Sequence, residues 1–266
     1  MPEAVRLGFN LGVSPGVNAV CGEWAMPERL AQARRLGFGA VEGPVPDDPA
    51  RLRAQLDALG MAFECLSFAR GDPARGELGM ACLPGRQREF REELERTIDA
   101  ALQLGCHRLH PLAGQVPETA QRAACEAAYL GNLSDACRCA AAAGIRIVIE
   151  PIGRHRQPRY LLHTSAQALS YIDRLGSGRL GLILDLHHAR GSGESPEAIA
   201  AAHAGVIDLL QVAGWPRRCA PSPHDSVLRG TWQALARAHW SGCVSAEYEP
   251  EDHTEDSLAW MAVIEA

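Results

Sequence analysis

The sequence of 266 residues contains no lysine, and its 26 basic residues are all arginines. Schiff-base chemistry is therefore excluded, because it requires a lysine amine as the nucleophile. Acidic residues also outnumber basic ones, 32 against 26, which gives a formal net charge of -6. A protein that grips a phosphate backbone usually presents a basic face, so we expect no nucleic-acid partner.

Disulfide and zinc-module patterns are missing as well. The nine cysteines are scattered, and only Cys137 and Cys139 lie close together, with no CxxC pair. An odd, dispersed set of this kind is typical of a reduced intracellular protein. The amino-terminal residues show no signal-peptide pattern, and no run of about 18 apolar residues could span a membrane. We therefore expect a cytoplasmic protein without a membrane partner.

What the sequence does contain is a regular alternation of short apolar runs and longer amphipathic stretches. The runs predict strands over residues 5–10, 39–43, 61–67, 106–112, 145–150, 179–185, 206–212 and 243–247. The stretches predict helices over residues 26–36, 49–59, 87–104, 118–143, 165–175, 196–203, 231–238 and 254–264. Gly131-Asn132 is a candidate break inside the fourth of these helices.

Eight strand–helix units in series predict a parallel sheet closed into a (β/α)8 TIM barrel, a single domain over residues 1–266. The length agrees, because such barrels have about 250 residues. An open doubly wound sheet is the alternative, but no GxGxxG motif follows the first strand. The loop over residues 69–85 is long for a compact domain, which is typical of a functional lid or a disordered segment.

Four consecutive predicted strands each end in a side chain that offers an oxygen. They are Glu150, Asp185, Gln211 and Glu247. In a barrel the carboxyl ends of the strands surround one mouth, where TIM-barrel active sites lie. Three carboxylates there would repel one another unless a cation lay between them, and such a set suits Mg²⁺ or Mn²⁺. Each residue alone is more often a helix cap or a surface charge, so the prediction rests on their occurring together.

Several segments also match a known family. They are residues 71–79, 83–87, 109–114, 149–152, 184–188, 211–213 and 247–250. Through these motifs nearly the whole chain resembles the hydroxypyruvate isomerase family, within the xylose isomerase-like TIM barrels that also include ketose 3-epimerases. The resemblance implies an aldose–ketose type isomerase acting on a small hydroxy-keto acid. Its reaction would resemble hydroxypyruvate to tartronate semialdehyde, through an enediolate.

The resemblance also implies roles for individual residues. The family's metal ligands match Glu150, Asp185, Gln211 and Glu247, so the implied cofactor is a divalent metal, Mg²⁺ or Mn²⁺. Glu150 and Glu247 match the family's acid/base pair as well. Which of the two removes the first proton is left open.

Four further residues are expected to contact the substrate. His110 lies in a matching motif, and His188 matches the family histidine three residues after the aspartate. Arg218 falls where the family has an arginine, and a planar guanidinium could hold a substrate carboxylate. Arg217, or an arginine of the loop over residues 69–85, is the second choice.

The chain departs from the family pattern in three loops over the expected mouth, residues 12–22, 153–158 and 216–226. These departures spare the metal centre and leave the substrate open. One alternative is a ketose 3-epimerase, or another sugar or sugar-acid isomerase with the same site. Another is a non-catalytic sugar-acid binding protein, against which the retention of all four ligand positions argues. The partner is a small molecule in each case, and the resemblance also allows a homo-oligomer.

Overall fold

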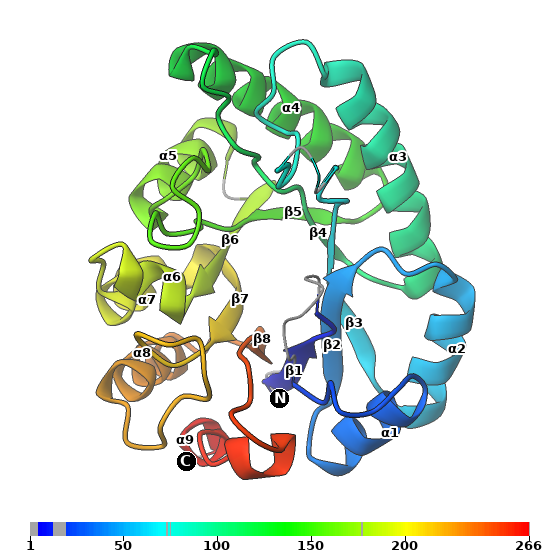
Figure 1. The fold of residues 1–266 in the computed structure, drawn as a ribbon, viewed down its shortest axis with the longest axis vertical. Helices are drawn as coiled ribbons and strands as arrows, with labels where there is room; N and C mark the ends of the chain where they lie inside the picture. Colours follow the sequence, from blue (N-terminus) through cyan, green and yellow to red (C-terminus); the bar gives the residue numbers. More distant parts are fainter. Residues whose placement is uncertain (1–4, 13–19, 73, 75, 177, 266) are drawn as a thin grey trace.

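The protein is a closed barrel of eight parallel strands with helices around it, as Figure 1 shows. The computed structural model describes residues 5–12, 20–72, 74, 76–176 and 178–265. The strands are β1 (Arg6–Asn10), β2 (Ala40–Pro44), β3 (Ala62–Ser67), β4 (Arg108–His110), β5 (Arg146–Ile149), β6 (Leu180–Asp185), β7 (Ile207–Val212) and β8 (Cys243–Ala246). β1 pairs in parallel with both β2 and β8, so the first and last strands close the ring. The predicted (β/α)8 TIM barrel is thereby confirmed.

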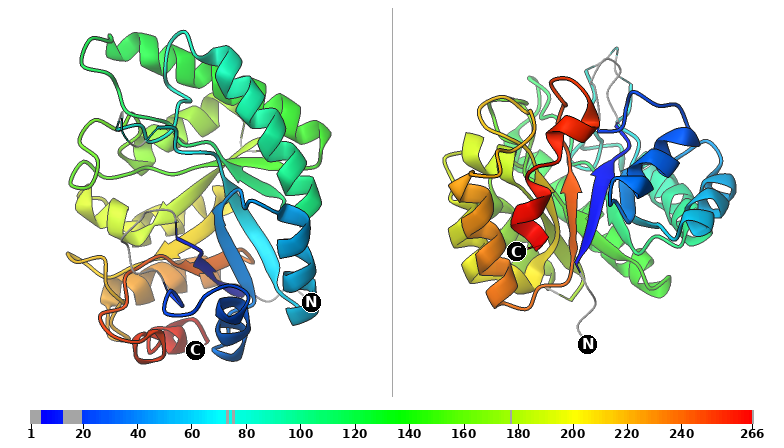
Figure 2. Two further views of the ribbon diagram at one scale, coloured as in Figure 1. Left: turned by 45° about the vertical axis from the view of Figure 1, so that its right-hand side comes forward. Right: turned by 90° about the horizontal axis from the view of Figure 1, so that it is seen from below.

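The helices lie outside the ring of strands, which the two further views make clear (Figure 2). They are α1 (Glu28–Arg35), α2 (Pro49–Leu59), α3 (Gln87–Leu104), α4 (Arg122–Ala142), α5 (Ser165–Leu175), α6 (Leu186–Gly191), α7 (Pro196–His203), α8 (Ser226–Arg237) and α9 (Met261–Glu265), with short 3-10 helices η2 (Ala204–Val206) and η3 (Thr254–Ser257). Over the described ranges, no helix has the length and apolar character needed to cross a membrane.

Local signals explain why some helices have the predicted bounds. The side chain of Asp48 accepts a hydrogen bond from the backbone nitrogen of Arg51 at 2.9 Å and caps the start of α2. α2 then ends at Gly60, whose φ of 62° lies in the left-handed region that glycine adopts at little cost. α2, α3, α5 and α7 all agree with the sequence prediction in both bounds.

Other helices differ from the prediction for identifiable reasons. α4 runs unbroken through Gly131-Asn132, because Asn132 is buried and its side chain donates to the carbonyl of Ala81 at 2.8 Å. α8 begins at Ser226 instead of residue 231, because Asp225 caps it by accepting from the nitrogen of Val227 at 2.9 Å. The predicted last helix is divided into η3 and α9, and α6 follows β6 without a loop.

Apolar side chains fill the barrel interior and the space between the strands and the helices. A separate interior cluster takes one buried residue from each of six strands: Ala40, Cys65, Val148, Ile183, Leu209 and Cys243. A much larger cluster packs the outer faces of the strands against the helices. This layering is what a closed parallel barrel requires, since its strands are buried on both faces.

Charged residues close the amino end of the barrel. Glu64 on β3 pairs with Arg6 at 2.6 Å and with Arg108 at 2.8 Å. Asp208 on β7 pairs with Arg146 at 2.7 Å and with Arg108 at 3.5 Å. The network joins five strands through their side chains, and Glu64 within it is only 3% exposed.

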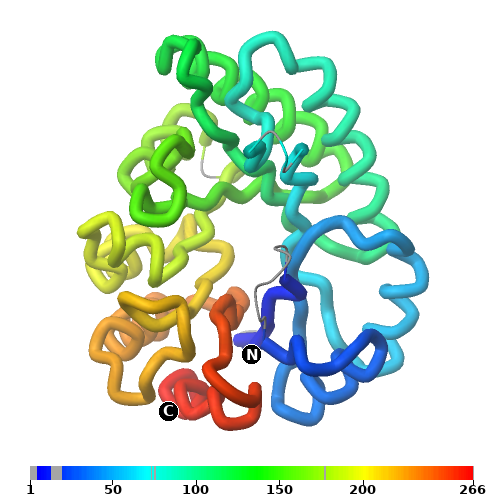
Figure 3. The backbone as a smooth tube through the Cα atoms, in the orientation of Figure 1, coloured from blue at the N-terminus to red at the C-terminus, as the bar shows by residue number. Residues whose placement is uncertain are grey.

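Residues 79–82 of the long loop over residues 69–85 are packed against the segment that follows β4. The backbone nitrogen of Cys82 donates to the carbonyl of Ala113 at 2.7 Å. Gly79, with φ of 89°, lies so close that a Cβ atom there would be 2.3 Å from the carbonyl oxygen of Leu112. Figure 3 traces the backbone around this closed ring of strands and helices.

Candidate active site

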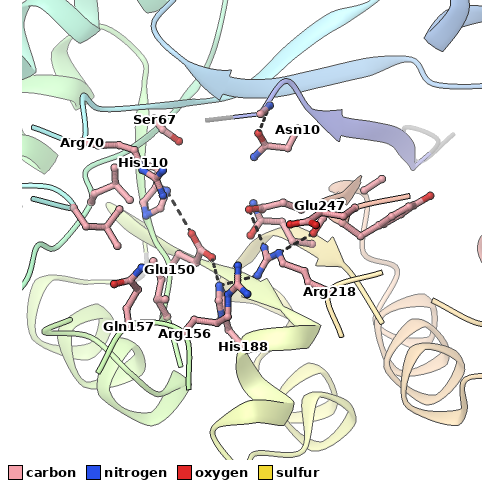
Figure 4. A pocket seen from close by; sticks show the side chains of 18 of the residues that line it. Asn10, Ser67, Arg70, His110, Glu150, Arg156, Gln157, His188, Arg218 and Glu247 are labelled. Atoms are coloured by element: carbon pink, nitrogen blue, oxygen red, sulfur yellow. Dashed lines mark hydrogen bonds and ion pairs between the residues drawn. The ribbon is translucent and has the colours of Figure 1, made fainter. Parts of the chain in front are cut away.

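The carboxyl ends of the strands carry a cluster of buried polar side chains directly above the apolar interior. Side chains alternate along a strand, so residues two positions after an interior residue also point into the barrel. Five buried polar residues meet this condition: Glu42, Glu150, Asp185, Gln211 and Ser245. Glu247 follows two positions after Ser245, at the end of β8. Figure 4 shows Glu150 and Glu247 on opposite sides of one pocket.

Glu150 is buried, and no described residue forms a hydrogen bond with its side chain. Its two oxygens lie 3.8 Å from Nδ1 of His110 and 3.6 Å from Nε2 of His188, beyond normal hydrogen-bond range. Burial lowers the pKa of His110 to about 4 and the pKa of His188 to about 3, so both rings are neutral at pH 7. Burial, followed by the charges of Glu247 and Asp185, raises the pKa of Glu150 well above its usual value. Protonation, or a cation close by, would therefore stabilise this buried carboxylate.

Arg218 supplies positive charge at the centre of the cluster. Its Nη2 donates to Oδ2 of Asp185 at 2.8 Å and forms an ion pair with Oε1 of Glu247 at 2.8 Å. Its Nη1 donates to Nε2 of His188 at 3.0 Å, so the neutral His188 ring carries its proton on Nδ1. Burial is the largest influence and opposes ionisation of Asp185, but the Arg218 charge and the contacts with His188 together outweigh it, so the pKa of Asp185 lies below its usual value. For Glu247 burial prevails, and its pKa is raised despite Arg218.

Glu42 on β2 is a further carboxylate that the sequence analysis did not assign to the site. It accepts from Nε2 of Gln211 at 3.0 and 3.1 Å and from the hydroxyl of Ser245 at 2.5 Å. Burial, with a smaller contribution from Glu247, raises the pKa of Glu42 to about 8. A signal was present, because Glu42 follows Ala40 by two positions near the end of a buried strand. The prediction had considered only the fifth to eighth strands.

The donor atoms fit a divalent metal ion. Oε1 of Gln211 and Oε2 of Glu247 are buried and have no hydrogen-bond partner in the described part of the chain. Glu150, Asp185 and His188 each place one potential ligand atom within 4.8 Å of the others. An oxygen-rich set with one imidazole nitrogen suits a hard cation such as Mg²⁺ or Mn²⁺. His188, which the sequence analysis assigned to the substrate, lies beside these oxygens, and its Nε2 already accepts from Arg218.

The structure separates the residues predicted to bind substrate. His110, His188 and Arg218 line the pocket with the carboxylates. Arg217 does not: its side chain is 76% exposed and pairs with Glu251 at 2.8 Å on the surface. The expectation of Arg217 at the site therefore has no support from its position. Arg70, from the long loop over residues 69–85, does line the pocket.

The pocket is small and partly open to solvent. Its cavity has a volume of about 180 Å³. Arg156 and Gln157, from the loop that departs from the family pattern, line it on the side of Glu150 (Figure 4). The Arg156 side chain has no hydrogen bond or ion pair with any described residue. The cavity therefore presents a free arginine beside the buried carboxylates.

Comparison with known proteins gives consistent matches over nearly the whole chain. A family model described as xylose isomerase-like TIM barrel matches residues 30–264. The 2-oxo-tetronate isomerase of Cupriavidus necator is 34% identical over 242 residues, which are 90% of this chain and 93% of that protein. The hydroxypyruvate isomerase of Escherichia coli is 30% identical over 254 residues, which are 94% and 98% of the two chains.

Solved structures show the same architecture. A crystal structure described as AP endonuclease, family 2, from Brucella melitensis has a TM-score of 0.87 and 28% identity, with 98% of both chains covered. A structure of L-ribulose 3-epimerase has a TM-score of 0.73 and 20% identity, covering 97% of this chain and 86% of that one. At that identity the second likeness concerns the fold alone.

Proposed function

The chain belongs to the xylose isomerase-like TIM barrel family and is an isomerase, and we propose that it interconverts a small hydroxy-keto acid and its carbonyl isomer. In the proposed reaction the carbonyl group moves between C2 and C3 of a three- or four-carbon acid. Hydroxypyruvate would give tartronate semialdehyde. One observation carries the proposal: buried carboxylates with raised pKa values converge with Arg218 in a cavity of small-molecule size.

The proton transfers are assigned to Glu150 and Glu247. They lie on opposite sides of the pocket, so a substrate between them would present one face of its reacting carbons to each (Figure 4). One carboxylate removes the proton from the hydroxyl-bearing carbon, and the other, which starts protonated, gives its proton to the former carbonyl carbon. The hydroxyl proton passes to the oxygen of the former carbonyl, so that no net proton is gained or lost.

A divalent metal, which we infer to be Mg²⁺ or Mn²⁺, would act as a Lewis acid toward the negative charge that develops on the substrate oxygens. Glu150, Asp185, Gln211 and Glu247 remain the proposed ligands. All of these side chains are buried or line the pocket, so the protein holds the donors in place before a metal ion binds.

Arg218 is the proposed partner of the substrate carboxylate. Its guanidinium already lies between Asp185 and Glu247 at the base of the pocket, where a small acid would meet it. Arg156 and Arg70 line the same cavity and would attract an anion toward it. The unpaired cysteines, seven of them buried, support the prediction of a cytoplasmic protein.

The test is a screen of purified protein with hydroxypyruvate, four-carbon 2-oxo acids and free ketoses, each with Mg²⁺, Mn²⁺ or EDTA. We expect turnover of the acids, dependence on the metal, and little turnover of the ketoses. Arg217→Gln is a matched control for Arg218→Gln, because only the second residue lines the pocket. Epimerisation of ketoses alone would replace the proposal by a ketose 3-epimerase. Binding of acids without turnover would indicate a sugar-acid binding protein.

A further inference from the structure

We propose that Glu42 is a positioning residue, which turns the Gln211 amide so that its oxygen faces the metal-binding end of the pocket. The inference rests on the proposed metal-dependent function. Glu42 does not line the pocket, whereas Gln211 does, so Glu42 would act through its neighbour.

The contacts of the Gln211 amide are divided between its two ends. Nε2 donates to both oxygens of Glu42, at 3.0 and 3.1 Å. Oε1 is buried and has no partner within the described residues. The Gln211 amide nitrogen and the Ser245 hydroxyl both donate to Glu42, so Glu42 is the acceptor here and the amide has one favourable orientation. The reverse orientation would place two acceptors against each other and aim an N–H group at the cation.

Glu42 is itself fixed in place. The hydroxyl of Ser245 donates to its Oε1 at 2.5 Å, and its backbone carbonyl accepts from the nitrogen of Leu11 at 2.8 Å. Ser245 is the register partner of Gln211 across β7 and β8, which brings both donors to the same carboxylate. Glu42 is 3% exposed, and a buried carboxylate is stable only with such hydrogen bonds.

The decisive variant is Glu42→Gln, which preserves the size of the side chain. Both oxygens of Glu42 contact the same Gln211 nitrogen, so an amide at position 42 places a donor against that nitrogen whichever way it lies. We expect the Gln211 amide to turn over. Loss of an outer-shell partner typically weakens metal binding about 10–100-fold, and we expect an increase of that size in the dissociation constant for Mn²⁺. Free Mn²⁺ is measured by electron paramagnetic resonance during titration of the full chain.

The reciprocal exchange Glu42→Gln with Gln211→Glu tests orientation directly. In that variant the amide at position 42 donates to the carboxylate at position 211, whose other oxygen faces the pocket. We expect Mn²⁺ affinity close to that of the unmodified protein. Ser245→Ala leaves both acceptor oxygens of Glu42 in place and should weaken Mn²⁺ binding less than Glu42→Gln does.

A double-mutant cycle separates orientation from simple negative charge. If Glu42 acts by orienting Gln211, then Glu42→Gln should cause no further loss of Mn²⁺ affinity once Gln211→Met has removed the amide. Additive losses would overturn the inference, as would unchanged Mn²⁺ affinity in folded Glu42→Gln. If that variant does not fold, the exchange variant decides, because weak Mn²⁺ binding there contradicts the inference. Absence of Mn²⁺ binding by the unmodified protein would remove the proposed metal as well, so the two failures are distinguishable.

Discussion

Glu150→Gln should abolish most activity while making the metal-free protein more stable. Loss of a general base or acid typically costs about 10²–10⁴ in rate, or about 2.7–5.4 kcal/mol of barrier at about 1.36 kcal/mol per tenfold change. The stability gain follows from the raised pKa of Glu150, because burial and the charges of Glu247 and Asp185 all oppose its ionised form. No hydrogen bond of normal length is lost, since the nearest ring nitrogens lie 3.6 and 3.8 Å away.

The sign of the pH dependence can be stated for this variant. A carboxyl group whose pKa is raised on folding destabilises the protein progressively as pH rises above its unfolded pKa of about 4.5. The neutral amide avoids that loss. The difference in unfolding free energy between Glu150→Gln and the unmodified protein should therefore be small near pH 4.5 and should widen toward pH 8. Urea unfolding in EDTA measures it, beside kcat/KM for hydroxypyruvate with Mn²⁺.

Glu64→Gln is the matched control at the opposite end of the barrel. Glu64 is equally buried but is paired with Arg6 and Arg108. We expect it to lose about 1–3 kcal/mol of stability, below the cost for a fully buried pair because Arg6 is 45% exposed. Its turnover should remain near normal. Near-native turnover by Glu150→Gln, or a loss of stability as large as that of Glu64→Gln, would refute the reasoning.

Three further predictions concern single measurements. Arg218→Lys should raise KM for the acid at least about tenfold, because a lysine cannot replace the planar set of donors that contacts Asp185, Glu247 and His188 and still offer an N–H group to the substrate; an unchanged KM would contradict this. His110 is buried with its pKa lowered to about 4, so it binds a proton on unfolding below pH 6.5. This uptake lowers the free energy of unfolding by about 2 kcal/mol at pH 5. Urea unfolding of His110→Asn should therefore show a smaller fall in the free energy of unfolding between pH 7 and pH 5. Cys139 and Cys219 are the partly exposed thiols and should react first with a thiol reagent at pH 8, whereas rapid reaction of more than two thiols would contradict the burial of the rest.

The position of the site could be predicted because the end of a strand can be recognised from neighbouring residues in the sequence. Glu150 and Asp185 each follow a buried apolar run, and a parallel barrel brings all such ends to one mouth. Asp185 is also a helix cap, the more common role of such a residue, because it accepts a hydrogen bond from the backbone nitrogen of His188 at 2.9 Å at the start of α6. One carboxylate thus serves both the helix and the site, which no pattern of residue types could distinguish.

Contacts between distant strands could not be predicted in the same way. Glu42 and Gln211 are 169 positions apart and meet because the ring closes between β1 and β8. The fate of Gly131 is similar: glycine costs about 1 kcal/mol relative to alanine inside a helix, yet α4 continues because tertiary contacts of its buried face outweigh that cost. Local sequence preferences were enough to locate the helices and strands. Which side chains contact each other, and whether α4 continues through Gly131, depended on long-range packing.

The ionic network at the amino end has a consequence for how this barrel can change over generations. Arg108 forms ion pairs with carboxylates on both β3 and β7, so the network connects several strands at the end of the barrel opposite the pocket. Mutations in the loops 153–158 and 216–226 leave these ties intact. Natural selection can therefore alter what enters the pocket without first rebuilding the framework. Relatives that share about a third of their residues with this chain carry the names of different sugar-acid isomerases, as such freedom would allow.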